Sequence, residues 1–292
     1  MKSNTKILSF LFVGLVAFAC SNNSGTTSGS GGTLLKFDLD KGKQYGYNIE
    51  MNSTQNYQGR DFQSKMNFGY DMEVLDKTDS ATTIRATYTR IAMDIASPSG
   101  NITLDSDQPL KDTAANGELD PTTLMKQMFA SMKGKSFVMT VAPDGTITQI
   151  TGVDQMAEAM FNGMQVPEQY RQQMRAYFSQ QFNNETLRQS FGNALNIYPN
   201  KAVKVGDKWE KKSNVTVAGS PVMSATTYTV KSIDGDRVTI DMAADVNNGS
   251  GTQTGTLVVD ADNGLVIEAN SAQKLTQPMT INSTMKIQGK EK

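Results

Sequence analysis

Residues 66–74 read MNFGYDMEV and alternate between apolar and polar side chains. Because successive side chains of a β-strand point to opposite faces, this stretch would place one face on a core and the other in water. The same period of two recurs at 45–51 and 238–246. Pairs such as Asp144-Gly145 and Asn263-Gly264, which tolerate the positive φ of tight turns, separate runs of this kind. These patterns predict a chain that is mainly antiparallel β.

The order of these features repeats along the chain. Tyr45 in the first half corresponds to Trp209 in the second, each three residues after a glycine, and Tyr70 corresponds to Tyr228. We therefore expect two pseudo-repeated antiparallel meanders that form one large curved sheet or half-barrel, packed by helices. Chance similarity between two sets of amphipathic hairpins is the alternative explanation of the repeat.

Two inserted segments have the period of a helix. Asp120-Pro121 is typical of an N-cap followed by proline at the first helical position. The larger segment runs from 153 to 195, and Pro167 restarts a helix within it. Large apolar residues recur there at helical spacing: Met156, Met160, Met164, Met174 and Phe178.

The β pattern resumes after these helices, which favours a single β-rich domain over residues 34–292. We divide it into a first repeat at 34–152 with an insertion at 97–133, a helical insert at 153–199, and a second repeat at 200–292. An arrangement of two sandwich domains is the alternative.

The N-terminus has the features of a bacterial lipoprotein signal peptide over residues 1–19. Lys2 and Lys6 flank the start of an apolar run of about a dozen residues, shorter than the roughly 20 that a transmembrane helix needs. Ala17-Phe18-Ala19-Cys20 then resembles a lipobox, in which small residues precede the cysteine that receives the lipid. Cys20 is the one cysteine in the chain, so we expect lipidation there. A secretory peptide that leaves a free Cys20 is the alternative.

Residues 20–33 are rich in glycine and serine and predict a flexible tether after the lipidated cysteine. Ser21 stands where enterobacterial lipoproteins of the inner membrane carry aspartate. No acidic residue, of the kind that favours surface export in Bacteroidota, occurs between Cys20 and Asp38. By these two resemblances we expect a lipid anchor in the cell envelope, at the outer membrane and facing the periplasm.

The composition excludes several kinds of site. The 292 residues include no histidine, which removes Ser-His-Asp and Cys-His catalysis and histidine-ligated metals. A single cysteine excludes an intramolecular disulfide and a cysteine-cluster metal site. The formal net charge of −1 provides no basic field for nucleic acid. We expect no cofactor, no metal and no nucleic-acid partner.

Three further motifs accompany the lipobox. They are Lys41-Gly42-Lys43-Gln44-Tyr45, the dipeptide Tyr198-Pro199, and residues 203–209, which read VKVGDKW. Together these residues resemble the Bacteroidota lipoproteins grouped as domain-of-unknown-function family 6263, over residues 34–292. The resemblance implies an envelope location and an overall plan, but no activity and no catalytic residues.

Enzymatic motifs are few. Ser271 and Lys274 have Ser-x-x-Lys spacing, but in a strand these two positions face opposite sides. Residues 260–264 resemble the start of a calcium loop, yet they are one residue short and lack the closing glutamate, so a turn is favoured. A His-independent hydrolase with a carboxylate pair stays open as an alternative, although no pair is singled out.

Methionine is abundant, with 17 residues. Thioethers suit Cu(I), but these methionines lie on amphipathic faces among Phe and Tyr, which favours core packing or the lining of a ligand cavity. We take the helical residues as candidate lining for an apolar ligand, namely Met156, Met160, Met164, Met174 and Phe178. A filled core is the alternative.

Two short motifs predict protein modification. Asp79-Ser80-Ala81 and Asp112-Thr113-Ala114 match the Asp-Ser/Thr-small pattern of O-glycosylation in Bacteroidota, and both fall in expected turns or loops. Ser80 and Thr113 are therefore candidate glycosylation sites.

The patterns together favour a membrane-anchored cell-envelope lipoprotein without catalytic activity, acting as a scaffold or binding an envelope protein partner. The first alternative is a carrier of lipid or another apolar ligand in a cavity lined by methionine and aromatic side chains. The hydrolase is the second.

Overall fold

The computed structural model describes residues 32–57, 59–98, 100–108, 121–164, 167–217, 220–246, 249–276 and 280–292. The predicted signal peptide 1–19, the lipidation site Cys20 and the glycosylation candidate Thr113 lie outside these ranges. What the sequence indicates for them stays a prediction.

The dominant feature is one antiparallel sheet of 12 strands. Its strands are β2 (Gln44–Tyr57), β3 (Arg60–Lys77), β4 (Thr82–Ser97), β5 (Gly100–Asp105), β6 (Ser136–Val141), β7 (Ile147–Thr151), β9 (Lys208–Val217), β10 (Ser220–Asp234), β11 (Arg237–Val246), β12 (Gly251–Asp260), β13 (Val266–Leu275) and β14 (Thr280–Glu291). The order is β7-β6-β4-β3-β2-β14-β13-β12-β11-β10-β9, with β5 on β4. A separate pair joins β1 (Thr33–Leu34) to β8 (Ala202–Val203).

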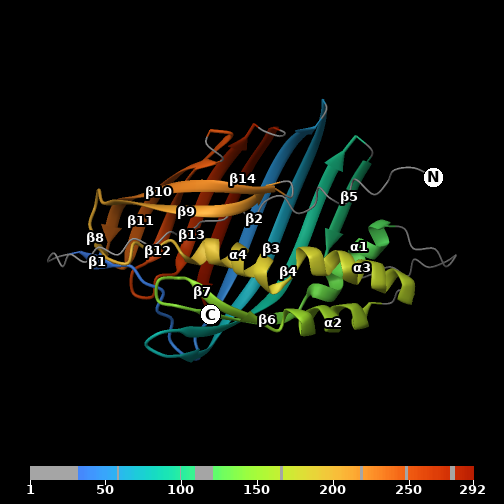
Figure 1. Cartoon of the computed structure of the whole chain (residues 1–292), viewed down its shortest axis with the longest axis horizontal. Coiled ribbons are helices and arrows are strands. Elements are labelled where there is room, and N and C mark those ends of the chain that lie inside the picture. Colours follow the sequence, from blue (N-terminus) through green and yellow to red (C-terminus); the bar gives the residue numbers. More distant parts are fainter. Residues whose placement is uncertain are drawn as a thin grey trace.

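The two parts of the chain meet in the middle of the sheet, where β14 pairs with β2. The sheet is open, because β7 and β9 end the order at opposite edges. In Figure 1, β9 and β10 run across the direction of the other strands, which shows how strongly the sheet curves. The predicted fold class, mainly β with a large curved sheet and helices packed on it, is confirmed.

Within the described residues, four helices form where the sequence predicts helical inserts. α1 (Pro121–Met132) packs on β4 and β5, α2 (Val153–Gly163) contacts α1 and β6, α3 (Glu168–Gln181) lies on α2, and α4 (Asn184–Leu195) packs on β7. The Asn183 side chain caps α4 by accepting a hydrogen bond from the Thr186 amide at 2.9 Å. Within the described residues, no helix has the length and hydropathy needed to cross a bilayer.

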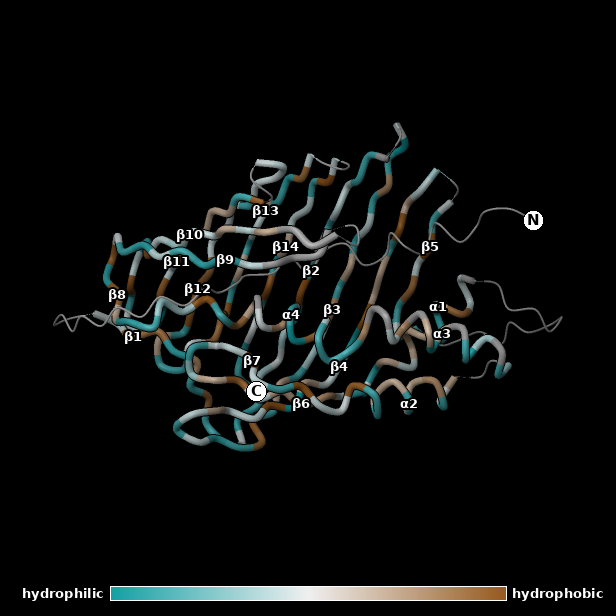
Figure 2. The backbone as a smooth tube through the Cα atoms, viewed as in Figure 1, coloured by the Kyte–Doolittle hydropathy of each residue, from teal (hydrophilic) through white to brown (hydrophobic). Residues whose placement is uncertain are grey.

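The sheet has an apolar inner face, toward the helices, and a polar outer face. Figure 2 shows the alternation of hydrophobic and hydrophilic positions along the strands. On the inner face, Met72, Ile84 and Phe137 are at most 2% exposed. The ring of Phe191 from α4 contacts the rings of Tyr70 and Phe137 at 5.8 and 5.3 Å. The helices therefore cover the face that the period of two assigns to the core.

The two halves share one hydrogen-bond pattern at the start of their long hairpins. The Gly42 amide donates to Val74 O, and the Gly206 amide donates to Val230 O, both at 2.9 Å. Trp209 is opposite Tyr228 in the register, but Tyr45 is opposite Met72. The predicted correspondence of Tyr70 with Tyr228 is therefore wrong by two residues. The physical reason is the length of the hairpins. β2 and β3 pair without interruption, and their hairpin is longer than that of β9 and β10, so Met72 and not Tyr70 takes the position of Tyr228.

Candidate functional site

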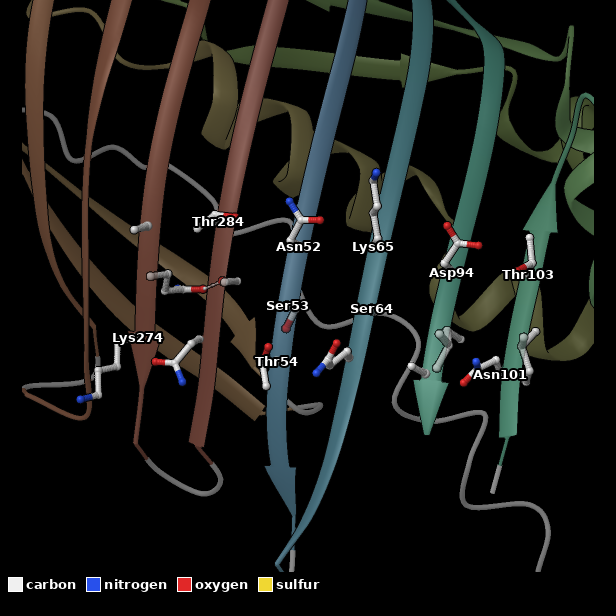
Figure 3. Close-up of a pocket in the computed structure, with 18 of the residues that line it drawn as sticks. Asn52, Ser53, Thr54, Ser64, Lys65, Asp94, Asn101, Thr103, Lys274 and Thr284 are labelled. Atoms are coloured by element: carbon white, nitrogen blue, oxygen red, sulfur yellow. Dashed lines mark hydrogen bonds between the residues drawn. The ribbon is translucent and has the colours of Figure 1, made fainter. Parts of the chain in front are cut away.

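The outer face of the sheet is hollowed into a shallow trough of about 890 Å³. It crosses seven neighbouring strands, from β5 through β4, β3, β2, β14 and β13 to β12. At a strand spacing near 4.8 Å, its length is about 30 Å. Figure 3 views it from the side opposite the helices, with Asn52, Lys65 and Asp94 standing out from the sheet.

Most of the lining consists of neutral amides and hydroxyls, from outward-facing positions of the strands and from the inward-facing serines between them, Ser53, Ser64 and Ser283. Representative residues are Asn52, Thr54, Gln63, Asn101, Asn282 and Thr284. The charged side chains in it are Lys65, Lys274 and Asp94, and Lys65 is directly opposite Asp94 in the register. Among the described residues that line the trough, none is aromatic, methionine or arginine. The trough therefore offers many hydrogen bonds, little net charge and no ring for stacking.

The inner face changes from apolar to mixed along the strands. Met285, Met51, Met66 and Met93 are consecutive cross-strand partners on β14, β2, β3 and β4. The next inward row toward the β2–β3 hairpin contains serines instead: Ser283, Ser53 and Ser64. Beyond the methionine row the inner face is mixed, because the serines and Gln55 lie there beside the buried Leu275 and Ile281.

Buried tyrosines form part of the inner face. The rings of Tyr47 and Tyr70 stack with centroids 5.2 Å apart, and Tyr70 is opposite Tyr88 in the register. Burial raises the pKa of Tyr47, Tyr70 and Tyr88 well above the usual phenol value, because the phenolate would be desolvated. These hydroxyls stay protonated at neutral pH and do not supply a phenolate base.

The predicted apolar lining lies in a packed part of the helical layer. Met156, Met160, Met164 and Phe178 are buried, with Met160 at 0% exposure, and Met174 is partly buried. Phe178 packs its ring on those of Phe161 and Phe182, at centroid distances of 5.6 and 4.6 Å. None of the five residues lines the trough or a second hollow, of about 40 Å³, beside Tyr45 and Tyr47. Their role in ligand binding stays a prediction.

Ser80 is exposed in the turn between β3 and β4. The Thr78 amide donates to Ala81 O at 2.8 Å and closes this turn, while the Ser80 hydroxyl stays at the surface. The position is accessible to a modifying enzyme, and glycosylation there stays a prediction.

The weak enzymatic motifs form no chemical site. Ser271 and Lys274 lie in β13, with Ser271 half-buried and Lys274 exposed on the outer face. The carboxylate of Asp260 accepts from the Asp262 amide and from Asn263 Nδ2, both at 2.9 Å, so it stabilises its own turn. No cluster of three or more potential metal ligands occurs among the described residues.

These features define an open antiparallel β-sheet protein with helices on one face and a polar trough on the other. Within this class, the chain belongs to the family of unknown function DUF6263, whose model matches residues 79–266. The predicted family is confirmed, and it assigns no catalytic residues. No curated protein matches the chain.

Three solved structures are similar to the chain at low identity. A lipovitellin structure, titled for its lipid–protein interactions, has 12% identity and a TM-score of 0.47 over 87% of this chain, which spans only 25% of the lipovitellin chain. A protein with a YmcC-like fold from Bacteroides fragilis has 10% identity and a TM-score of 0.26, covering 88% and 99% of the two chains. An outer membrane channel from Pseudomonas putida F1 has 7% identity and a TM-score of 0.28, covering 91% and 100%.

Proposed function

We propose that this protein is a non-catalytic, membrane-anchored scaffold of the cell envelope that binds an uncharged glycan chain in the outer trough. The observation that carries the proposal is the trough itself, with its amide and hydroxyl lining across seven strands. A length of about 30 Å suits an extended polymer better than a small molecule.

The lining also distinguishes a glycan from a protein partner. The cores of protein interfaces are enriched in aromatic residues, methionine and arginine, and the trough presents none of these. Side-chain amides and hydroxyls instead match the donors and acceptors of sugar hydroxyls, directly or through water. Two positive charges against one negative charge favour a ligand with little charge of its own.

The proposed lipid anchor would compensate for the weak binding of each single trough. A shallow, exposed trough without stacking rings binds each ligand weakly. Many copies tethered in one membrane can bind a long glycan together, because linked sites raise the effective concentration of one another. We place the protein at the outer membrane, facing the periplasm, on the basis of the N-terminal sequence.

The anchor has a direct test. We expect Cys20→Ala to abolish incorporation of labelled palmitate in the natural host, because the thiol at this position is the lipid acceptor. The cell fraction that contains the protein should change from membrane to soluble. Equal labelling of the wild type and the variant would contradict the anchor.

The trough is tested by removing two amides from it. We expect Asn52→Ala together with Asn282→Ala to weaken binding of neutral oligosaccharides about tenfold, since each lost hydrogen bond contributes roughly 0.5–1.5 kcal/mol. The measurement is calorimetric titration across a panel of neutral oligosaccharides, with the corresponding monosaccharides for comparison.

Asn270→Ala is the matched control. Asn270 is exposed on the same face of β13 but does not line the trough. The Asn270→Ala variant should bind oligosaccharides as tightly as the wild type does. Binding by the wild type that the double substitution leaves unchanged would place the glycan elsewhere, and no binding by the wild type would reject the proposal.

A further inference from the structure

The hairpin of β9 and β10 carries a buried lysine that has no carboxylate partner. Lys211 is 8% exposed and donates one hydrogen bond, to Asn196 Oδ1 at 3.1 Å. Within the described ranges, no ion pair includes it. The next residue in the chain, Lys212, is exposed and lies 3.6 Å from Glu210. A buried ammonium without a counter-charge is strongly destabilising, so its retention calls for an explanation.

Two buried serines lie beside this lysine on the same face. Ser213 and Ser224 are directly opposite each other, and Lys211 is opposite Thr226, one inward-facing position along the hairpin. Ser213 is 6% exposed and Ser224 is 1% exposed. Neither hydroxyl has a hydrogen-bond partner among the described residues. Because a buried hydroxyl normally finds a partner, two adjacent exceptions are suited to contact a polar ligand.

The three groups together suit an anion. An ammonium has three donors, and Lys211 directs one of them to the side chain of Asn196. The hydroxyls of Ser213 and Ser224 can each donate to an oxygen that bears negative charge. Residues opposite each other in a sheet have Cβ atoms about 5 Å apart, and residues two apart along a strand lie about 7 Å apart, which is a suitable span for a carboxylate or phosphate.

The surroundings indicate what is attached to the anion. Trp209 and Tyr228 occupy the next inward-facing row on the same two strands, and their rings stack with centroids 5.4 Å apart. From Tyr228, this row continues across the sheet to Met242 on β11. Gly255 and Ser271 then connect it to Met285, the first of the four methionines. Tyr228 and Met242 are buried, so an apolar chain along this row takes the place of side chains that now cover it, with its charged end at Lys211.

We propose that Lys211, Ser213 and Ser224 bind the carboxylate or phosphate group of an amphipathic ligand whose apolar chain lies along the inner face. This site is on the opposite face of the sheet from the glycan trough and is independent of it. β9 has a strand partner on one side only, because it ends the sheet.

Trp209 provides the readout, because it is the single tryptophan and lies two residues from Lys211. Decanoate, decyl phosphate, decanol and inorganic phosphate are titrated separately into the mature protein, and Trp209 emission is followed. We expect decanoate and decyl phosphate to bind at least tenfold more tightly than decanol. Binding of inorganic phosphate as tight as that of decyl phosphate would support the anion site and overturn the part of the proposal that concerns the apolar chain.

Lys211→Met is the decisive variant, since it keeps the length of the side chain and removes the charge. We expect at least tenfold weaker binding of both anions, unchanged binding of decanol, and a melting temperature without ligand that is equal to or above that of the wild type. Lys212→Met removes the same charge at the exposed neighbour and should change none of these values.

Ser213→Ala combined with Ser224→Ala tests the hydroxyls separately and should also weaken anion binding. Unchanged anion binding in Lys211→Met, or no anion binding by the wild type, would overturn the proposal. Neither result affects the trough, whose variants lie on the other face.

Discussion

A Gly264→Ala variant is expected to lose about 4 kcal/mol or more of its unfolding free energy, a size of effect that single substitutions seldom reach. Gly264 has φ +77°, and a Cβ atom placed there would lie 1.9 Å from the backbone oxygen of Lys36. The obstacle is main chain, so no rotamer change can relieve it. The turn at 260–264 and the segment that contains Lys36 must therefore separate.

That separation would break further contacts of the turn. The Asp38 amide donates to Asn263 O at 2.9 Å, and the buried hydroxyl of Tyr198 donates to Gly264 O. Leaving these groups unpaired in the interior adds about 1–3 kcal/mol for each one. The measurement is a denaturant titration of the protein, followed by circular dichroism.

Gly235→Ala is the matched control. Gly235 also has positive φ, +64°, but no atom lies within 4 Å of the site of its Cβ. We expect it to lose only about 1–2 kcal/mol, from the left-handed backbone alone. Equal losses in the two variants would show that the segment at Lys36 does not pack on the turn.

A Trp209→Ala variant is expected to lose about 3–5 kcal/mol. The indole stacks on Tyr228, which is fully buried, and its Nε1 donates to Ile197 O at 2.8 Å. Truncation opens a cavity against Tyr228 and frees the segment between α4 and β8, because it removes the hydrogen bond that holds Ile197. The expected result is a lower denaturation midpoint with a single transition.

Two companion variants separate the sources of this loss. Trp209→Phe keeps a ring on Tyr228 and removes the hydrogen bond, so we expect about 1–2 kcal/mol. Met223→Ala changes a side chain on the same hairpin that is 58% exposed, and it should stay within about 0.5 kcal/mol of the wild type. A loss below about 1 kcal/mol for Trp209→Ala would contradict the anchoring role.

The sequence predicted the elements of the fold well because their signals are local. Alternation at 66–74 falls within β3, where Met72 and Val74 are buried and the residues between and before them, Asp71 and Glu73, are half-buried. Asp120-Pro121 marks the start of α1, and Asn183 caps α4. Each of these signals depends on neighbours within a few residues, which the chain order alone specifies.

The candidate sites were predictable only in part. Alternation at 66–74 predicted that polar residues of that strand face water, but it did not single out Asn52 or Lys65. The trough exists because strands distant in the sequence lie side by side. The correspondence between Tyr70 and Tyr228 was wrong because the two hairpins differ in length, which places Met72 opposite Tyr45.

The burial of Lys211 could not be predicted from the sequence. In residues 208–212, KWEKK, this lysine is indistinguishable in chemistry from Lys212, and charges in such a run are ordinarily solvated. One signal was available, because Trp209, Lys211 and Ser213 share one face at a period of two. That face is buried only because the hairpin of β9 and β10 curves across the sheet (Figure 1).

The sequence by itself determined the strands, the helices, the turn glycines and the family, since local periodicity and short-range stereochemistry encode each of them. The tertiary structure alone decided that β14 pairs with β2, that the outer face is hollow, and that Lys211 lies inside while Lys212 lies outside. The physical reason is that sheet order and curvature arise from contacts between segments far apart in the chain. Local sequence patterns do not specify the free energy of those contacts.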